Sequence, residues 1–218
     1  MRTPKPDFSL EDALTGPVAG IDEAGRGPLA GPVVAACVLL PRGAAWLGGL
    51  HDSKQLTALR REALSAHILA EAAYGIGLAS AAEIDALNIH RATLVAMQRA
   101  FAAMGQPCGH VLVDGKFTPA LPCPATAVVK GDSRSLSIAA ASIVAKVHRD
   151  RIMQELHARN PAYGWDRNAG YPTAAHRAAL RTHGVTEAHR RSYAPVREIL
   201  VASATPYSDC NTEKRIFQ

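Results

Sequence analysis

The sequence has few cysteines, and their positions exclude the usual zinc-binding frameworks. The four cysteines are Cys37, Cys108, Cys123 and Cys210, and no two of them share a CxxC or CxxH spacing. Structural zinc sites place their ligands at such short spacings. A chain of 218 residues can bury a core of its own without covalent cross-links. Scattered cysteines in such a chain indicate a reducing compartment, so we expect a cytoplasmic protein.

The sequence also lacks long hydrophobic runs and a strong excess of either charge. No stretch reaches the ~20 apolar residues that a membrane-spanning helix needs. The opening MRTPKPDFSLEDAL has no apolar run of the length found in signal peptides. Lys and Arg number 24 against 19 for Asp and Glu, which gives a formal net charge of +5. This mildly basic balance permits a polyanionic partner but does not require one.

The length and the pattern of apolar residues predict one mixed α/β domain over residues 17–202, with flexible ends at 1–16 and 203–218. Short apolar runs predict strands at 18–21, 33–40, 74–80, 110–113 and 125–129. Helical spacing predicts helices at 57–73, 82–104 and 135–159, followed by a helical part from about 172 to 200. The first two strands, joined by a Gly/Pro turn, are typical of an antiparallel pair.

Four acidic residues follow the predicted strands. Asp22 and Glu23 end the first strand, Asp114 ends the fourth and Asp132 follows the fifth. In open α/β sheets ligands gather beyond the strand ends, so these side chains can meet in space. Their mutual repulsion would raise their pKa values, and hard divalent cations with oxygen ligands relieve it. The pattern therefore indicates two Mg²⁺ or Mn²⁺ ions, a pair that can activate water and stabilise the leaving oxygen of a phosphodiester.

Each acidic position also has a simpler interpretation. Asp22-Glu23 can begin a solvated turn, Asp114-Gly115 is a common turn dipeptide, and Asp132 can cap a helix. What favours a joint site is that all three positions fall at the ends of apolar strands.

The glycine-rich segment Gly25-Arg26-Gly27 comes directly after the first acids. Its backbone can approach a ligand closely and donate to sugar or phosphate oxygens, although a plain tight turn explains it equally well. A P-loop has the pattern Gly-x4-Gly-Lys-Ser/Thr. Gly20 and Gly25 have its glycine spacing, but Arg26 and Gly27 stand where Lys and Ser/Thr are needed, so a P-loop is excluded. A dinucleotide-binding fingerprint is also excluded, because the spacing of Gly25, Gly27 and Gly31 does not match its GxGxxG pattern.

Several of these segments together resemble one family, the bacterial ribonucleases HII (type 2 ribonucleases H). The similar segments are 20–36, 52–56, 113–115, 130–133, 138–150 and 170–176. The resemblance runs from about residue 18 to about residue 200. The lead-in is too short for the additional N-terminal domain of the related HIII type.

The resemblance implies an RNase H-like fold, in which helices flank a five-stranded mixed sheet and a helical C-terminal part follows. It implies that Asp22, Glu23, Asp114 and Asp132 are catalytic and bind the metal ions. It also implies that substrate is bound by Gly25, Arg26, Gly27, Lys54, Lys146 and Tyr171. In this family the glycine loop contacts the ribose 2′-OH, the group that distinguishes RNA from DNA, and the tyrosine stacks on the neighbouring deoxyribose.

The resemblance places Lys54 near backbone phosphates and Lys146 near the metal ions. The basic C-terminal helices would lie along the duplex, with a solvated surface as the simpler alternative. The basic residues of this part are His176, Arg177, Arg181, His183, His189, Arg190, Arg191 and Arg197.

The implied reaction is hydrolysis of the phosphodiester on the 5′ side of a ribonucleotide, leaving a 3′-OH and a 5′-phosphate. The implied substrates are RNA–DNA hybrids and duplex DNA with embedded ribonucleotides, cut by a monomer. Two alternatives stay open, because a fold alone does not fix function. One is another nuclease of the same fold acting on DNA, and the other is a non-catalytic nucleic-acid-binding module.

Overall fold

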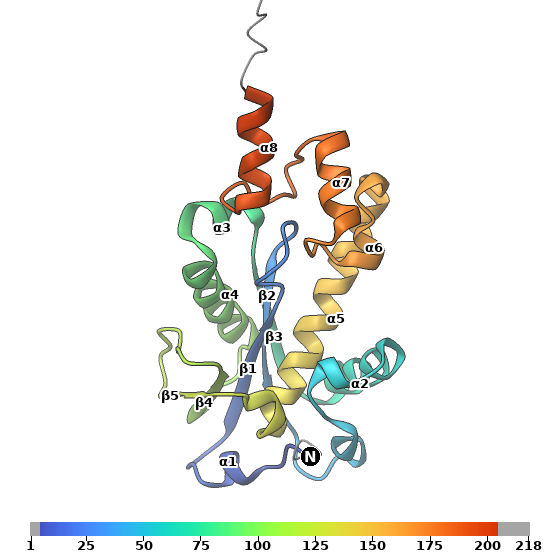
Figure 1. The fold of residues 1–218 in the computed structure, drawn as a ribbon. Coiled ribbons are helices and arrows are strands. Elements are labelled where there is room, and N and C mark those ends of the chain that lie inside the picture. The colour runs from blue at the N-terminus through green and yellow to red at the C-terminus, as the bar shows by residue number, and fades with distance from the viewer. Residues whose placement is uncertain (1–4, 205–218) are drawn as a thin grey trace, which may run out of the picture.

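A five-stranded sheet forms the centre of the computed structural model, which describes residues 5–204 (Figure 1). The strand order is β3-β2-β1-β4-β5. The bounds are β1 (Val18–Ala24), β2 (Val33–Leu39), β3 (Ala73–Ala79), β4 (His110–Asp114) and β5 (Ala125–Val128). The pairs β3–β2 and β2–β1 are antiparallel, whereas β1–β4 and β4–β5 are parallel. The predicted mixed sheet is confirmed.

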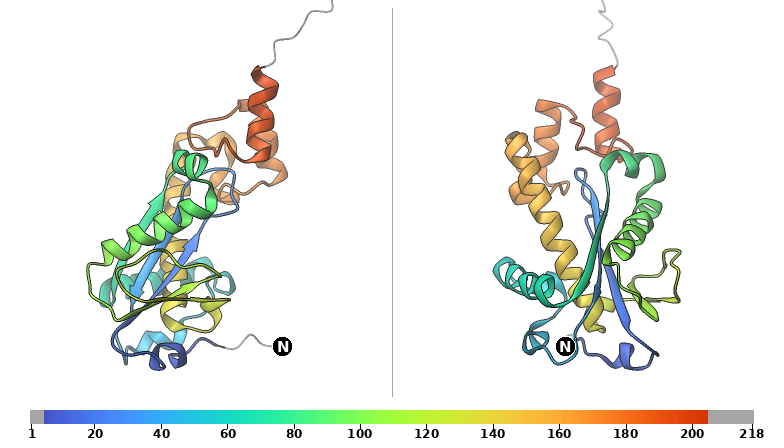
Figure 2. Two further views of the ribbon diagram at one scale, coloured as in Figure 1. Left: turned by 90° about the vertical axis from the view of Figure 1, so that its left-hand side faces the viewer. Right: turned by 180° about the vertical axis from the view of Figure 1, so that it is seen from behind.

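Helices cover both faces of this sheet (Figures 1 and 2). One face carries α2 (Ala58–Glu71) and α5 (Leu136–Arg159), and the other carries α3 (Ala81–Leu87) and α4 (Ile89–Met104). A helical C-terminal part follows, with α6 (Trp165–Asn168), α7 (Ala174–His183) and α8 (Ala194–Ala204). Short 3₁₀ turns lie at Ala45–Gly49, Ser53–Gln55, Gly131–Ser133 and Pro161–Tyr163.

Glycines in the strands allow the helices to approach the sheet closely. A Cβ atom on Gly75 would lie 2.2 Å from the carbonyl oxygen of Ala100, and one on Gly77 would lie 2.2 Å from that of Ala96, both in α4. Gly20 is equally close to the backbone of Ser137 in α5. These glycines lower strand propensity, but the close helix–sheet packing requires them.

The predicted helix over 82–104 is wrong in one respect, because the chain breaks at Asn88. Asn88 has a φ of +67° and its side chain accepts a hydrogen bond of 3.1 Å from the backbone N–H of Arg91. It therefore ends α3 and caps the N-terminus of α4. Asn tolerates a left-handed φ and is a favoured N-cap, so one residue serves both ends.

Part of the N-terminal segment expected to be flexible is instead packed on the domain. It contains α1 (Ser9–Asp12), and the carboxylate of buried Glu11 accepts hydrogen bonds from Ser135 Oγ at 2.6 Å and from the backbone N–H of Ser137 at 3.0 Å. An acidic side chain at a helix N-terminus satisfies unpaired N–H groups. At the other end, residues 203 and 204 belong to α8, and the remainder of the predicted flexible end lies outside the described residues.

Within residues 5–204, no helix combines the length and the apolar character needed to cross a membrane.

Candidate active site

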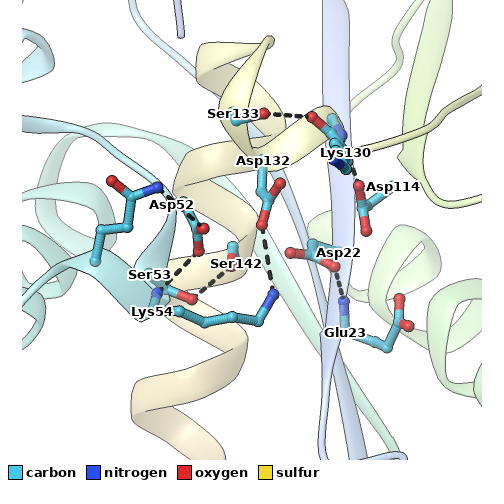
Figure 3. Close-up of polar contacts among 12 residues, drawn as sticks. Asp22, Glu23, Asp52, Ser53, Lys54, Asp114, Lys130, Asp132, Ser133 and Ser142 are labelled. Carbon is cyan, nitrogen blue, oxygen red and sulfur yellow. Dashed lines mark hydrogen bonds and ion pairs between the residues drawn. The ribbon is translucent and has the colours of Figure 1, made fainter. Parts of the chain in front are cut away.

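The four predicted acids gather at one edge of the sheet (Figure 3). The strand β1 runs three residues further than predicted: its pairing with β4 stops at Ile21, whereas its pairing with β2 continues to Ala24. Asp22 and Glu23 therefore lie where β1 extends past its parallel neighbour. Asp114 ends β4, and Asp132 lies in the 3₁₀ turn between β5 and α5.

The two acids on β1 point to opposite sides of the sheet, as neighbouring strand residues do. The side chain of Asp22 faces Lys54 and Ser142, while that of Glu23 turns toward the opposite side (Figure 3). The Asp114 carboxylate accepts a hydrogen bond of 2.7 Å from the backbone N–H of Gly131, which ties β4 to the turn that carries Asp132.

Burial and mutual repulsion make the negative charges of this group costly. Asp22 is only 5% exposed. Its burial, followed by the charges of Glu23 and Asp114, raises its pKa well above the usual range. Burial also raises the pKa of Glu23, with Asp114 adding to the effect and Arg26 opposing it. The pKa of Asp132 is raised by burial and by the charges of Asp52 and Asp114.

A lysine brings positive charge to the acids. The Nζ atom of Lys54 lies 3.5 Å from Oδ2 of Asp132. The loop that carries it is fixed, because the Asp52 carboxylate accepts from the backbone N–H of Lys54 at 2.9 Å and the hydroxyls of Ser53 and Ser142 are 2.7 Å apart. The segment 52–54 thus serves to hold one ammonium group against the carboxylates.

The donor set fits hard divalent cations. The four carboxylates supply oxygen ligands near the ends of β1, β4 and β5, and Oε2 of Glu23 is buried without a hydrogen-bond partner, which is a costly state for a polar atom. Glu23 and Asp132 each contact a cationic side chain, Arg26 at 3.3 Å and Lys54 at 3.5 Å. Within residues 5–204, no group of three or more His, Cys, Asp or Glu side chains is arranged so that it could hold a metal ion.

The glycine loop and Tyr171 share one hollow next to the acids. The hollow has a volume of about 310 Å³ and is lined by Gly25, Arg26, Gly27 and Tyr171 together with Glu23, Lys54 and Lys146. A Cβ atom on Gly27 would lie 3.6 Å from Cε1 of Tyr171, so the ring lies directly beside this glycine. The residues expected to bind substrate therefore surround a single space.

The two lysines make different contacts. Lys54 is the lysine in contact with the acids, whereas Lys146 pairs with Asp150 through a contact of 2.6 Å one helical turn further along α5. Both side chains still line the hollow.

The buried guanidinium of Arg190 binds the backbone of the glycine loop. This supporting role was not predicted from the sequence. The guanidinium donates to the carbonyl oxygens of Gly25 at 2.6 Å, Arg26 at 2.9 Å and Gly31 at 3.0 Å. The hydroxyl of Tyr193 donates to the same Arg26 carbonyl at 2.6 Å. Arg190 is 0% exposed, so its charge is neutralised by backbone dipoles and not by water.

A second buried arginine, Arg149 of α5, completes this support. It donates to the carbonyl oxygens of Ala30, Pro32 and Ala169 at 3.1–3.3 Å. A Cβ atom on Gly25 would lie 1.9 Å from its Nε atom. In the sequence, Arg149 is a cationic residue within a run of mostly apolar and small residues of α5, which indicates that it could be buried. The sequence does not identify the carbonyl groups that it binds.

Three of the basic C-terminal residues expected to lie along the duplex are instead buried in the protein. His176, His189 and Arg190 are at most 1% exposed and bind the protein itself. The Nε2 atoms of the two histidines are 3.2 Å apart, and Trp165 Nε1 donates to His176 Nε2 at 3.1 Å. His176 Nδ1 lies 3.0 Å from the carbonyl oxygen of Tyr171, so this buried cluster supports the segment that carries the tyrosine.

Comparisons with known sequences identify one family. The pattern of the family described as Ribonuclease HII matches residues 19–196. Ribonuclease HII of Rhodospirillum rubrum is 56% identical over 212 residues, covering 95% of this chain and 97% of that protein. Ribonuclease HII of Paracoccus denitrificans is 56% identical over 206 residues, covering 92% and 97%.

Solved structures agree as well. Ribonuclease H2 of Pyrococcus horikoshii superposes with a TM-score of 0.70 at 27% identity, covering 85% of this chain and 97% of that one. The RNase HII of Archaeoglobus fulgidus, solved in a complex with PCNA, gives a TM-score of 0.68 at 26% identity, covering 81% and 95%. With the acids at one sheet edge and the matching segments spread across the whole domain, the chain belongs to the ribonuclease HII family of endoribonucleases.

Proposed function

We propose that this endoribonuclease hydrolyses the phosphodiester on the 5′ side of ribonucleotides, both in RNA–DNA hybrids and at single ribonucleotides in duplex DNA. The products are a 3′-OH and a 5′-phosphate. One observation supports the proposal: the four carboxylates near the strand ends lie next to the glycine loop and Tyr171. The acids suit phosphodiester chemistry, and the loop suits the recognition of ribose.

Asp22, Glu23, Asp114 and Asp132 would hold the divalent cations, two Mg²⁺ or Mn²⁺ ions. Such ions supply an activated water and stabilise the charge on the leaving 3′ oxygen. The cations would also offset the burial and the repulsion that together raise the pKa of Asp22. Lys54 already neutralises part of this charge and would contact the phosphate or the acids.

The loop residues Gly25, Arg26 and Gly27 would contact the 2′-OH through their backbone. A hydroxyl that both donates and accepts is best selected by fixed backbone groups. Two buried arginines fix this backbone, since they hold the carbonyls of residues 25, 26 and 30–32. Tyr171 would stack on the neighbouring deoxyribose, and Lys146 would face the phosphates. We expect the enzyme to act as a cytoplasmic monomer that initiates the removal of ribonucleotides from DNA.

The test is cleavage of an end-labelled DNA duplex that contains one ribonucleotide, beside an all-DNA duplex of the same sequence. We expect one cut 5′ to the ribonucleotide with Mg²⁺ or Mn²⁺, no cut with EDTA and no cut in the all-DNA control. Equal cleavage of both duplexes would show a nuclease that acts on DNA. Binding without cleavage with either metal would show a non-catalytic module.

A further inference from the structure

A second, shallow hollow lies on the other side of the Glu23–Arg26 pair. Glu23 and Arg26 line both hollows, and their side chains are joined by a 3.3 Å contact. Beyond this pair the second hollow, of about 30 Å³, is lined by Asp114, Lys116, Phe117 and His90 among others. The acids Glu23 and Asp114 therefore border a second hollow that Tyr171 does not line.

The most exposed aromatic side chain of residues 5–204 stands on this surface. Phe117 is 61% exposed, and the other exposed aromatics are Tyr171 at 46% and Tyr74 at 38%. A single exposed apolar residue needs no explanation by itself. Phe117, however, is three residues after the candidate metal ligand Asp114 and lines a hollow with it.

The loop that carries Phe117 is anchored on both sides of the ring. This loop joins β4 to β5 and projects beside α4 (Figures 1 and 2). The backbone N–H of Gly115 donates to the carbonyl of Val128 at 3.0 Å, and Gln98 Nε2 donates to the carbonyl of Ala120 at 3.0 Å. The ring itself meets His90 edge-on, with centroids 4.8 Å apart and an interplanar angle of 70°. The exposed ring is thus held in place and does not belong to a loose tip.

We propose that Phe117 and Lys116 form a second duplex-binding surface, which contacts the flank of the scissile phosphodiester opposite the flank that Tyr171 contacts. This inference rests on the proposed function, because it assumes a nucleic-acid duplex across the acids. Two ordered, exposed aromatic rings then stand on either side of the Glu23–Arg26 pair. An apolar ring can pack on sugar or base faces without regard to sequence, and a neighbouring lysine can contact phosphate.

The proposal fits the charges of this surface. The carboxylates of Glu23 and Asp114 repel a polyanion, so a duplex that crosses them needs favourable contacts on both sides. Arg26 and Lys116 supply positive charge next to Phe117, and both line the same hollow. We therefore expect the backbone and groove of the duplex substrate to lie on this second surface.

The experiment measures kcat and KM on three duplexes with a single ribonucleotide: one with long flanks, and two shortened on one flank or the other. On the long duplex we expect Phe117→Ala to raise KM about five- to tenfold with kcat nearly unchanged. Phe117→Leu should behave like Phe117→Ala, and Phe117→Trp should restore the wild-type KM. Tyr74→Ala, which removes an exposed ring from the far edge strand β3, is the matched control and should change nothing.

The shortened duplexes identify the contact. Shortening one flank should make Phe117→Ala equal to wild type, and shortening the other flank should do the same for Tyr171→Ala. An unchanged KM for Phe117→Ala, a rise that persists on every duplex, or loss of both effects with the same flank would each overturn the proposal. If the wild type itself leaves the ribonucleotide duplex uncut, the proposed function has failed, which is a different result. An unchanged melting temperature of the Phe117 variants verifies that the fold is intact.

Discussion

The two halves of the site are stabilised in opposite ways. The acids at the strand ends repel one another, and burial raises the pKa values of Asp22, Glu23 and Asp132. The glycine loop is held by attraction, because buried Arg190 donates hydrogen bonds to the carbonyl oxygens of Gly25 and Arg26. The acids thus need added positive charge, while the loop is held by groups of the protein alone. Variants that act on one half and spare the other test this difference.

The largest expected effect is on catalysis by the acids. We expect Asp22→Asn to lower kcat about a thousandfold or more, because the amide can no longer help to hold two cations. It should leave the Kd for an uncleaved duplex nearly unchanged, and it should raise the melting temperature measured in EDTA, since a repelled buried charge is removed. Asp12→Asn, at an exposed acid paired with Arg42, is the control. A melting temperature in EDTA that fell below that of wild type would contradict the repulsion described for the acids.

A pair of glycine variants should separate loop geometry from loop contact. Gly25 has a φ of +94° and its Cβ would lie 1.9 Å from Arg149 Nε, so Gly25→Ala is expected to destabilise the protein by about 2–4 kcal/mol and to abolish most cleavage. Gly27→Ala meets only Tyr171 Cε1 at 3.6 Å, an ordinary contact, and should fold normally. Urea unfolding measures both. Equal destabilisation by the two variants would show that the arginine support does not restrict this loop.

Two adjacent arginines offer a sharper comparison. Arg190→Lys keeps the charge but loses the planar fork that reaches three carbonyls, so we expect about a tenfold to hundredfold fall in kcat/KM on a single-ribonucleotide duplex. Discrimination against the all-DNA duplex should fall with it. Arg191→Lys, at an exposed side chain, should have little effect. If both variants cleaved like wild type, the loop would not depend on the buried guanidinium.

The smallest expected effect is a dependence of stability on pH. Burial, with His176 adding to it, lowers the pKa of His189 to about 4. In the unfolded chain the pKa of a histidine is near 6.5, so protonation favours unfolding. The stability from neutral His189 is present above about pH 6.5 and is lost as the pH falls toward 4. Protonation would also stop Nδ1 of His189 from accepting the 3.1 Å hydrogen bond of the Thr186 N–H.

Thermal unfolding at pH 7 and pH 5 checks this expectation. The fall in melting temperature between the two should be smaller in His189→Gln than in wild type, even though the variant is less stable at pH 7. His67→Gln, at a half-exposed histidine on α2, should keep the wild-type slope. An identical slope in all three proteins would exclude His189 as its source.

The sequence was sufficient to locate the acids but not the support of the loop. Asp22 and Asp114 could be placed together because neighbouring parallel strands bring their ends to one edge, and short apolar runs reveal such strands. Arg190 could not be assigned, because its partners are carbonyl groups, which every residue carries. They lie up to 165 positions away in the chain, so no local pattern records the contact.

The same reason explains the other differences. Asn88 lies within a run of helical periodicity, and only its φ of +67° shows that it separates two helices. Glu11 looks solvated in a polar segment, yet its carboxylate is bound by residues near the start of α5. In each case a tertiary partner decides the conformation, and a polar residue in sequence gives no sign of that partner.

The long separation between the loop and Arg190 has a consequence for synthesis of the chain. All four acids lie within the first 132 residues of the chain, whereas the loop at residues 25–27 is held by an arginine that is translated 165 positions after Gly25. A chain that ends before residue 190 would therefore carry the four acids without the guanidinium that holds the loop. Under the proposed function, recognition of ribose would therefore require nearly the whole chain to be synthesised, whereas the acids are in place in the sequence much earlier.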